Sequence, residues 1–292
     1  MKKWQIIYLI FLFFSVQSDA QSLIGNNLYS LNPFALHPAY AGYQDELEAV
    51  LQARTRQMNT DENYTGSLLQ VNGKVNEHVG LGAKLATNKQ GIFEDFSLTL
   101  VSSYTTQLQE NHHLSFGIGL GITNFSINTN NFSANQFADA SDPLLRNGAI
   151  NQSAISISTG MLYRWKDLAL AISAPSLFQE ENGVRERITG SMQYTFGNGN
   201  LSVTPSILAR FYEINPTEIT VNARLAWKEK LWLQSGYRNN ESFLFGAGFY
   251  LNEITLGYSY GLTTGAFNDL ATGGHELLLG IRFGKKEDDG KE

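Results

Sequence analysis

The chain has 292 residues, of which 42% are apolar and 16% are charged, and it contains no cysteine. The absence of cysteine excludes a disulfide scaffold, a thiolate metal site and a cysteine nucleophile. A formal net charge of −6 argues against nucleic-acid binding, which needs a basic surface, and a mean hydropathy of −0.20 excludes a polytopic helical membrane protein.

Residues 1–20 have the features of a secretory signal peptide. Lys2 and Lys3 precede an apolar stretch from Ile6 to Phe14, and Ser18-Asp19-Ala20 places small residues before the expected cleavage site. The apolar stretch is about half the roughly 20 residues that a spanning helix needs, and a cleaved signal fits it better than a buried N-terminal helix does. Export of a chain without cysteine indicates a bacterial envelope protein.

From residue 47 onward the sequence alternates apolar and polar residues with a period of two, which is typical of β-strands with two unlike faces. In the clearest segment, apolar residues from Leu114 to Ile122 alternate with serine, glycine and threonine. The pattern predicts about fourteen strands and an all-β chain. The predicted strands are 47–56, 67–75, 79–87, 95–108, 113–125, 152–164, 168–175, 187–196, 201–212, 218–227, 231–238, 242–251, 254–262 and 275–284.

The strand lengths and the placement of charge indicate a transmembrane antiparallel β-barrel. Most predicted strands are near the roughly ten residues that a tilted membrane strand needs. Charged residues share the polar face of their strands, as expected if the other face meets lipid, where Lys or Arg at mid-depth costs about 2–4 kcal/mol. These residues are Glu48, Arg54, Arg56, Lys74, Lys84, Arg210, Arg224, Glu276 and Arg282.

The connections between strands alternate in length, as in outer-membrane barrels with a periplasmic short side. Tight turns are predicted at 76–78, 110–112, 165–167, 197–200, 228–230 and 252–253, and longer loops at 57–66, 88–94, 126–151, 176–186, 213–217 and 263–274; the short connection 239–241 is the exception. Residues 47–284 therefore form the predicted barrel and 285–292 a periplasmic tail. The non-alternating segment 21–46 either enters the lumen as a plug or lies at the periplasmic mouth.

The sequence offers little for catalysis. His112 and His113 lie at a predicted tight turn beside Glu110, and a solvated turn explains them better than a metal site does. His275 and Glu276 open the last predicted strand. Neighbouring strand residues face opposite ways, so neither pair can share one metal or one substrate atom within a strand. Asp269 with His275 would be a pair on one loop, without an indicated nucleophile. No catalytic residue, metal site or cofactor is predicted.

Several stretches resemble one known family. His37-Pro38-Ala39-Tyr40-Ala41-Gly42 is similar to the Asn-Pro-Ala-Tyr-Ala-Gly motif of the PorP/SprF family, outer-membrane proteins of the Bacteroidetes type IX secretion and gliding machinery. Further matching stretches follow in order: Gly80-Leu81-Gly82, Gly91, Asp142-Pro143, Pro205 to Leu208, Leu231-Trp232-Leu233, Tyr237-Arg238, Gly257 to Tyr260 and Gly274 to Leu277. The chain departs from the pattern where His37 replaces Asn, Gly261 an Asp, and Gly273-Gly274 a Gly-Ser.

The resemblance implies a non-enzymatic barrel in the outer membrane of a Gram-negative bacterium. Its partners would be membrane lipid, periplasmic components of the secretion system and a large exported surface protein, whose export or attachment the barrel supports. By this analogy, partner-binding residues are His37, Pro38, Ala39, Tyr40, Ala41 and Gly42 on the periplasmic side, and Asp142, Pro143, Gly274, His275 and Glu276 toward the exported protein. A passive porin is the alternative, because a lumen of small polar residues permits flow.

Overall fold

A computed structural model describes residues 26–58, 63–128, 149–175, 186–213, 217–239, 242–264 and 271–284. The predicted signal peptide, the pair Asp142-Pro143 and the predicted tail 285–292 lie outside these residues. In the described part of the chain, no helix has both the length and the apolar character needed to cross a bilayer.

The described chain begins with two short 3₁₀ turns and continues entirely as strands. The 3₁₀ turns are η1 (Pro33–Ala35) and η2 (Pro38–Tyr40). The strands are β1 (Leu47–Met58), β2 (Tyr64–Lys74), β3 (Val79–Gln90), β4 (Phe93–Gln109), β5 (His112–Asn128), β6 (Ala149–Trp165), β7 (Leu168–Ala174), β8 (Glu186–Tyr194), β9 (Phe196–Asn198), β10 (Leu201–Tyr212), β11 (Glu218–Trp227), β12 (Leu231–Arg238), β13 (Ser242–Leu251), β14 (Ile254–Thr263) and β15 (Ala271–Phe283).

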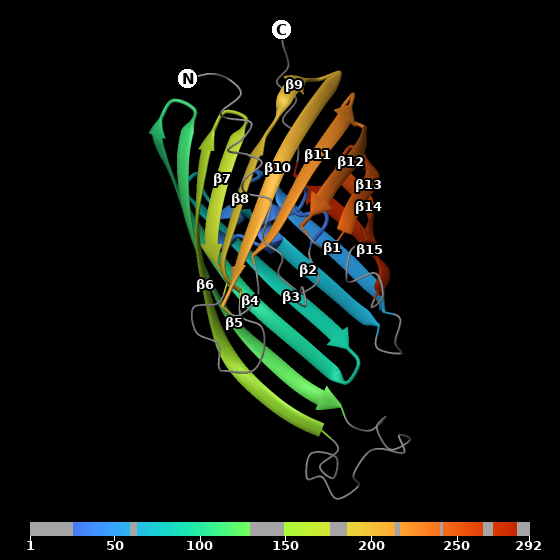
Figure 1. Cartoon of the computed structure of the whole chain (residues 1–292). Coiled ribbons are helices and arrows are strands. Elements are labelled where there is room, and N and C mark those ends of the chain that lie inside the picture. Colours follow the sequence, from blue (N-terminus) through green and yellow to red (C-terminus); the bar gives the residue numbers. More distant parts are fainter. Residues whose placement is uncertain are drawn as a thin grey trace, which may run out of the picture.

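The strands form one closed antiparallel barrel (Figure 1). Apart from β8 and β9, each strand pairs with its neighbour in sequence, and β1 pairs with β15 from Leu47↔Phe283 onward, which closes the sheet. The short β9 continues β8, because both pair with β10. Counting β8 and β9 as one interrupted strand gives the predicted number of about fourteen.

The interruption between β8 and β9 has a local cause. The pairing register places Pro205 of β10 opposite the end of β8, at Tyr194. Proline has no backbone N–H, so it removes one donor from a ladder. The other edge of β10 keeps an unbroken pairing with β11 through Pro205↔Ala223, and only the β8 side is disrupted.

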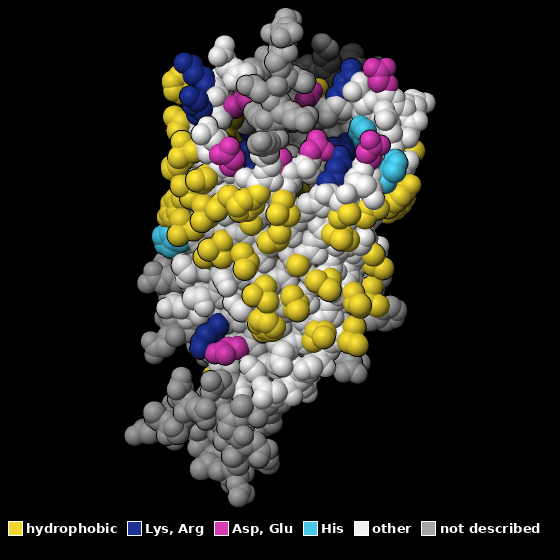
Figure 2. All heavy atoms as spheres, turned by 180° about the vertical axis from the view of Figure 1, so that it is seen from behind, with side chains coloured by type: hydrophobic (Ala, Val, Ile, Leu, Met, Phe, Trp, Pro, Cys, Tyr) yellow, Lys and Arg dark blue, Asp and Glu magenta, His cyan; other side chains and the backbone are white. Residues whose placement is uncertain are grey.

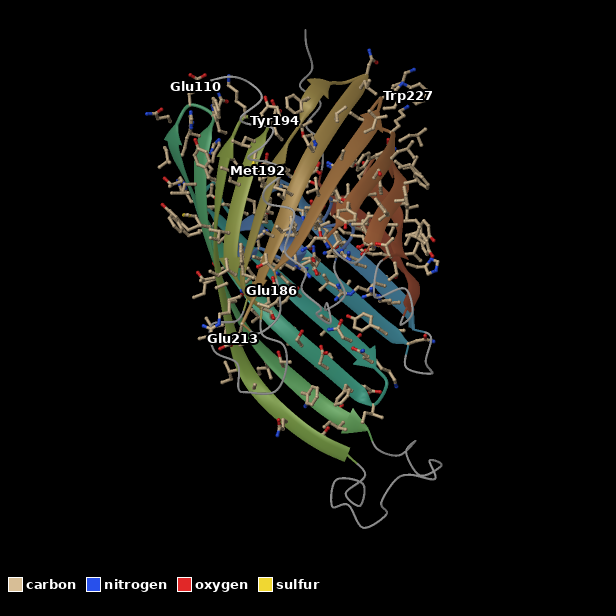
Figure 3. The ribbon with its side chains drawn as sticks, in the orientation of Figure 1. Glu110, Glu186, Met192, Tyr194, Glu213 and Trp227 are labelled. Atoms are coloured by element: carbon tan, nitrogen blue, oxygen red, sulfur yellow. The ribbon has the colours of Figure 1, made fainter. Side chains whose placement is uncertain are left out.

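The two faces of the sheet have opposite chemistry. The outer face carries exposed leucine, isoleucine, valine and phenylalanine, which form a broad apolar band across the side of the barrel that Figure 2 shows. The inner face carries the charged residues that the alternation placed there, among them the buried Arg210 and Glu276. Trp165 and Trp227 end β6 and β11 at the short-turn end and are exposed, as interfacial aromatic residues are (Figure 3 labels Trp227).

The two ends of the barrel differ in height. At one end tight turns join the strands, and Asn111, Lys228 and Glu229 adopt the positive φ angles that such turns require. At the other end the 17-residue strands β4, β5 and β6 extend beyond their neighbours (Figure 1). The predicted longer loop 88–94 is wrong, because β3 continues to Gln90 and β4 begins at Phe93, which leaves a two-residue turn of Gly91 and Ile92. The other predicted long loops lie largely outside the described residues. We call the end with the projecting strands the long-loop end.

The apolar band predicts a steep dependence of stability on depth along β5. Ile118 is 57% exposed in the band, while Asn124 lies on the same face of β5 beyond it. Ile118→Arg should lower the free energy of unfolding in lipid vesicles by about 2–4 kcal/mol, and Asn124→Arg by about 0–1 kcal/mol, because charge is tolerated near the interface. Urea titration of both variants measures the difference, and equal costs would contradict a lipid-facing band.

Candidate functional site

Residues 26–42, which we call the lumenal segment, lie inside the barrel (Figure 1). Leu28 and His37 have no exposed surface, and Phe34 and Tyr40 are each 3% exposed. The side chains and backbone of the segment contact inward-facing residues on most strands, as set out below. This packed interior is the candidate functional site.

The start of the segment is held by a buried carboxylate. The backbone N–H of Asn27 donates to Oε2 of Glu276 at 2.8 Å, and that of Leu28 donates to Oε1 at 3.2 Å. The side-chain amide of Gln52 donates to the same carboxylate. Both oxygens of Glu276 are therefore used to hold the segment, which satisfies a buried charge with three donors.

Asn27 is also held by side chains of β11 and β12. Its carbonyl oxygen accepts hydrogen bonds from the amides of Gln234 at 2.9 Å and Asn222 at 3.3 Å, and its Oδ1 accepts one from Nη2 of Arg238 at 2.9 Å. Together with Glu276, these contacts join one residue to β11, β12 and β15.

Apolar packing reinforces this anchor. Leu28 packs with Val50, Leu278 and the buried indole of Trp232, which points into the lumen although it is large and apolar. Its inward position is explained by the lumenal segment, which supplies the apolar neighbour that an open lumen would lack.

The middle of the segment is fixed by amides and one lysine. The side-chain amide of Asn32 donates to Gln52 at 2.9 Å and its oxygen accepts from Gln70 at 2.5 Å. The half-buried Lys84 donates to the carbonyl oxygen of Ala35 at 3.3 Å, and its ammonium lies 4.5 Å from the ring centroid of Phe34. These contacts give most of the polar groups a partner, as burial requires, but the buried Oε1 of Gln70 has no hydrogen-bond partner.

His37 bridges the segment to β7 and β8. Its Nδ1 lies 2.9 Å from the hydroxyl of Ser173, and its Nε2 lies 2.8 Å from that of Ser191. Ser173 donates its proton to the carbonyl oxygen of Leu36 at 3.1 Å. The Ser173 oxygen therefore accepts from Nδ1–H, and Nε2 accepts from the Ser191 hydroxyl, which assigns a neutral imidazole.

The surroundings of His37 keep it neutral. Burial lowers the pKa of His37 to about 3, and the nearby charges of Lys84 and Arg210 lower it further in the same direction. A protonated imidazole in this position would lose water on every side and face two cations.

The end of the lumenal segment fits against glycines of the inner wall. A Cβ on Gly80 would lie 2.1 Å from the carbonyl oxygen of Ala41, and one on Gly117 would lie 2.3 Å from the backbone nitrogen of Ala39. Neither distance can be accommodated without moving backbone atoms, so glycine is needed for this close approach. Ser103 also donates to the Ala41 carbonyl oxygen at 2.6 Å.

The lumenal segment lies between two cavities. The cavity toward the short turns measures about 290 Å³ and is lined by residues including Asn32, Glu48 and Arg282. The cavity toward the long loops measures about 360 Å³ and is lined by residues including Asn26 and Arg54. No residue lines both cavities.

A chain of buried charges lies near the long-loop cavity. Arg210 lies 3.8 Å from both Glu186 and Glu218, and Arg238 lies 3.4 Å from Glu218. Glu186 is near the middle of the barrel and Glu213 nearer the long-loop end (Figure 3). Positive and negative groups alternate in this cluster, and their attraction offsets the cost of removing each charge from water. The cluster is therefore consistent with an inner wall filled by protein.

The structure separates the residues that the sequence grouped as partner-binding. His37, Pro38, Ala39, Tyr40, Ala41 and Gly42 contact the inner wall of their own barrel, and Glu276 points inward with them. His275 points outward, where its Nδ1 lies 2.8 Å from the hydroxyl of Tyr258, and Gly274 lies on the wall beside Arg56. The binding of these residues to other proteins stays a prediction.

Sequence reasoning missed the anchoring role of Asn27 and Asn32, which lie in a segment without periodicity. Their barrel partners carried a readable signal, since Gln52, Gln70 and Gln234 all fall on the inward parity of their strands. Among the described residues, no group of His, Asp and Glu is arranged to hold a metal ion.

Comparison with known proteins identifies the family. Residues 17–281 match the model of the type IX secretion system membrane protein PorP/SprF. The chain belongs to this family. It is a membrane protein of the type IX secretion system, with the fold of an outer-membrane β-barrel of Gram-negative bacteria.

Solved structures share the fold at low sequence identity. The CymD monoaromatic hydrocarbon channel has 11% identity and a TM-score of 0.52, with coverage of 90% of this chain and 94% of that one. The toluene transporter TodX of Pseudomonas putida has 10% identity and a TM-score of 0.51, with coverage of 86% and 93%. No curated protein sequence matches the chain. The family and these neighbours are membrane proteins and channels.

Removing the Glu276 carboxylate should release the start of the lumenal segment. Glu276→Ala leaves two buried backbone N–H groups without their acceptor, which should lower the free energy of unfolding by at least about 2 kcal/mol. Glu253→Ala, in an exposed tight turn, is the matched control and should change it by less than about 0.5 kcal/mol. Urea titration in vesicles compares the two, and equal effects would contradict the anchoring role.

Because His37 is neutral in the folded barrel, the stability with which the lumenal segment is held should depend on pH. Because the folded pKa lies below the ordinary value of 6.5, the stability from neutral His37 is present above that value and is lost as the pH falls toward 3. Between pH 7.5 and pH 5 the loss should be about 2 kcal/mol. His37→Asn should show a smaller decrease over the same interval, and an unchanged decrease would contradict this assignment.

Proposed function

We propose that this barrel is a non-enzymatic scaffold that supports the export or surface attachment of a large secreted protein. The observation that carries the proposal is the position of the stretch His37 to Gly42, which carries the family resemblance. This stretch is built into the lumen and packed against glycines 80 and 117. A sequence feature typical of the family thus serves to keep the barrel filled.

The filled lumen favours a scaffold over a passive porin. Residues 26–42 are anchored by hydrogen bonds to β1, β2, β3, β7, β8, β11, β12 and β15, and they lie between two cavities that share no lining residue. In this state the exported protein would be held or guided by the outside and the ends of the barrel.

The two ends of the barrel suggest two classes of partner. Outer-membrane barrels turn their short connections toward the periplasm, so the tight turns would meet periplasmic components of the secretion system. The long-loop end, with the projecting strands β4 to β6, would meet the exported protein. Outer-membrane lipid would cover the apolar band between them.

The histidine and glutamate side chains that are most suited to catalysis form structural hydrogen bonds in this arrangement. His37 and Glu276 hold the lumenal segment, and His275 is bonded to Tyr258 on the outer face. The separation of His275 from Glu276 follows from the alternation of side chains along a strand. These contacts support a role without chemistry.

Deletion of the gene should remove one large exported protein from the cell surface, as measured by comparing surface proteomes. Wild type and Gly280→Ala should restore it, because a Cβ at position 280 meets only ordinary contacts of 3.4 Å or more. Gly117→Ala should restore less, because its Cβ would collide with Pro38 and Ala39 and unseat the lumenal segment.

Two outcomes would contradict the proposal. The first is an unchanged surface proteome after deletion, which would remove the secretion role. The second is a large steady conductance of the wild-type protein in planar bilayers, which would favour the porin. In the same assay, Gly117→Ala should conduct more than Gly280→Ala, because only the former disturbs the contents of the lumen.

A further inference from the structure

The outer face of β2 to β6 changes chemistry abruptly toward the long-loop end. The strand pairing there aligns residues into continuous rows that cross five strands. The last apolar row is Leu69, Leu85, Leu98, Ile122 and Ile155, in which each residue pairs directly with the next. These five side chains are 37–65% exposed, as lipid-facing residues are.

The next two rows are almost entirely polar. The first consists of Ser67, Thr87, Phe96, Asn124 and Ser153. The second consists of Thr65, Lys89, Glu94, Ser126 and Asn151. The border between the last apolar row and these rows marks where the sheet leaves the hydrocarbon, since hydroxyl and amide groups have no partners in it.

A hollow of about 430 Å³ lies over these polar rows, and we call it the border hollow. Thr87, Lys89, Glu94, Phe96 and Asn124 are among its lining residues. Below the apolar band, Figure 2 shows a zone of polar side chains with little charge. Most of its lining residues lie on the outer face, so the hollow opens outward next to the membrane border, while Gly66, Asn88 and Asp95 of the inner face also line it.

The groups in the border hollow are those that bind saccharides. Thr87 and Asn124 supply hydroxyl and amide groups that both donate and accept hydrogen bonds. Phe96 is 46% exposed in the middle of the first polar row and offers an aromatic surface against which a sugar ring can pack.

The charges in the hollow disfavour an anion. The ammonium of Lys89 lies 2.5 Å from Oε1 of Glu94, so the one cation in the lining is already paired with a carboxylate. A phosphate would compete with Glu94 for Lys89 and would be repelled by the carboxylate. A neutral, hydroxyl-rich group meets no such penalty.

We propose that the border hollow binds the saccharide headgroup of an outer-leaflet glycolipid. The acyl chains of this lipid would lie along the apolar rows below it, which favours a lipid over a soluble sugar. The border hollow lies beside the projecting strands β4 to β6, at the base of the long-loop end. The inference rests on the outer face alone and does not depend on the proposed secretion role.

The test uses the purified full-length protein in detergent, with bound lipid counted by native mass spectrometry. The probes are a lipooligosaccharide from which the phosphates have been removed, so that its headgroup is neutral, and phosphatidylglycerol, supplied separately at equal concentration. Thr87→Val combined with Asn124→Leu removes the polar groups from the hollow while keeping similar volumes. Ser235→Val, on the exposed outer face of β12 away from the hollow, is the matched control.

Wild type and Ser235→Val should retain the lipooligosaccharide, and the double variant should retain about tenfold less, the factor that corresponds to losing one or two net hydrogen bonds. Phosphatidylglycerol should be retained weakly and equally by all three. Equal retention of lipooligosaccharide by wild type and the double variant would overturn the proposal. So would wild-type retention of phosphatidylglycerol at the level of the glycolipid, which would indicate charge or acyl chains alone. Matching heat-modified mobility on gels confirms that the variants are folded.

Discussion

The lumenal segment depends on a closed sheet, and closure depends on the pairing of β1 with β15. Inside a bilayer no water is available to the backbone, and a sheet with a free edge would leave rows of N–H and C=O groups unpaired. Closing the barrel satisfies them and divides the side chains strictly into an outer and an inner set. The outer set is apolar because it meets lipid. The inner set includes charged groups, which need partners inside the lumen.

The contents of the lumen must therefore supply partners for the charged groups of the inner wall. Inward-facing Glu276 and Arg210 are buried and Lys84 is half-buried, and a charge removed from water is costly unless it is paired or hydrogen-bonded. The lumenal segment supplies partners to Glu276 and Lys84 through backbone groups of Asn27, Leu28 and Ala35. The glycines of the wall provide the space, so that wall and segment are complementary in both charge and shape.

The alternation of inward and outward side chains explains why the strands could be predicted closely. It also explains why the packing inside the lumen could not be predicted. A period of two is a local property of each strand, and the lipid on the outside enforces it, so the strand bounds from 201–212 and 218–227 agree with β10 and β11 to the residue. The inward Trp232 had no explanation in sequence, because its neighbour Leu28 is about 200 residues away along the chain. Likewise, His275 and Glu276 could be assigned to opposite faces, but the carboxylate's attachment to Asn27 could not be foreseen.

The sequence by itself determined the class of protein, the number and polarity of the strands, the unequal ends and the family, because all of these are written in short-range patterns and motifs. Only the tertiary structure decided that residues 26–42 occupy the lumen, that His37 is a neutral bridge between two serines, and that polar side chains on β2 to β5 join into one hollow beside the membrane border. These features arise from contacts between residues far apart in the chain, and the closed register of the barrel is what brings them together.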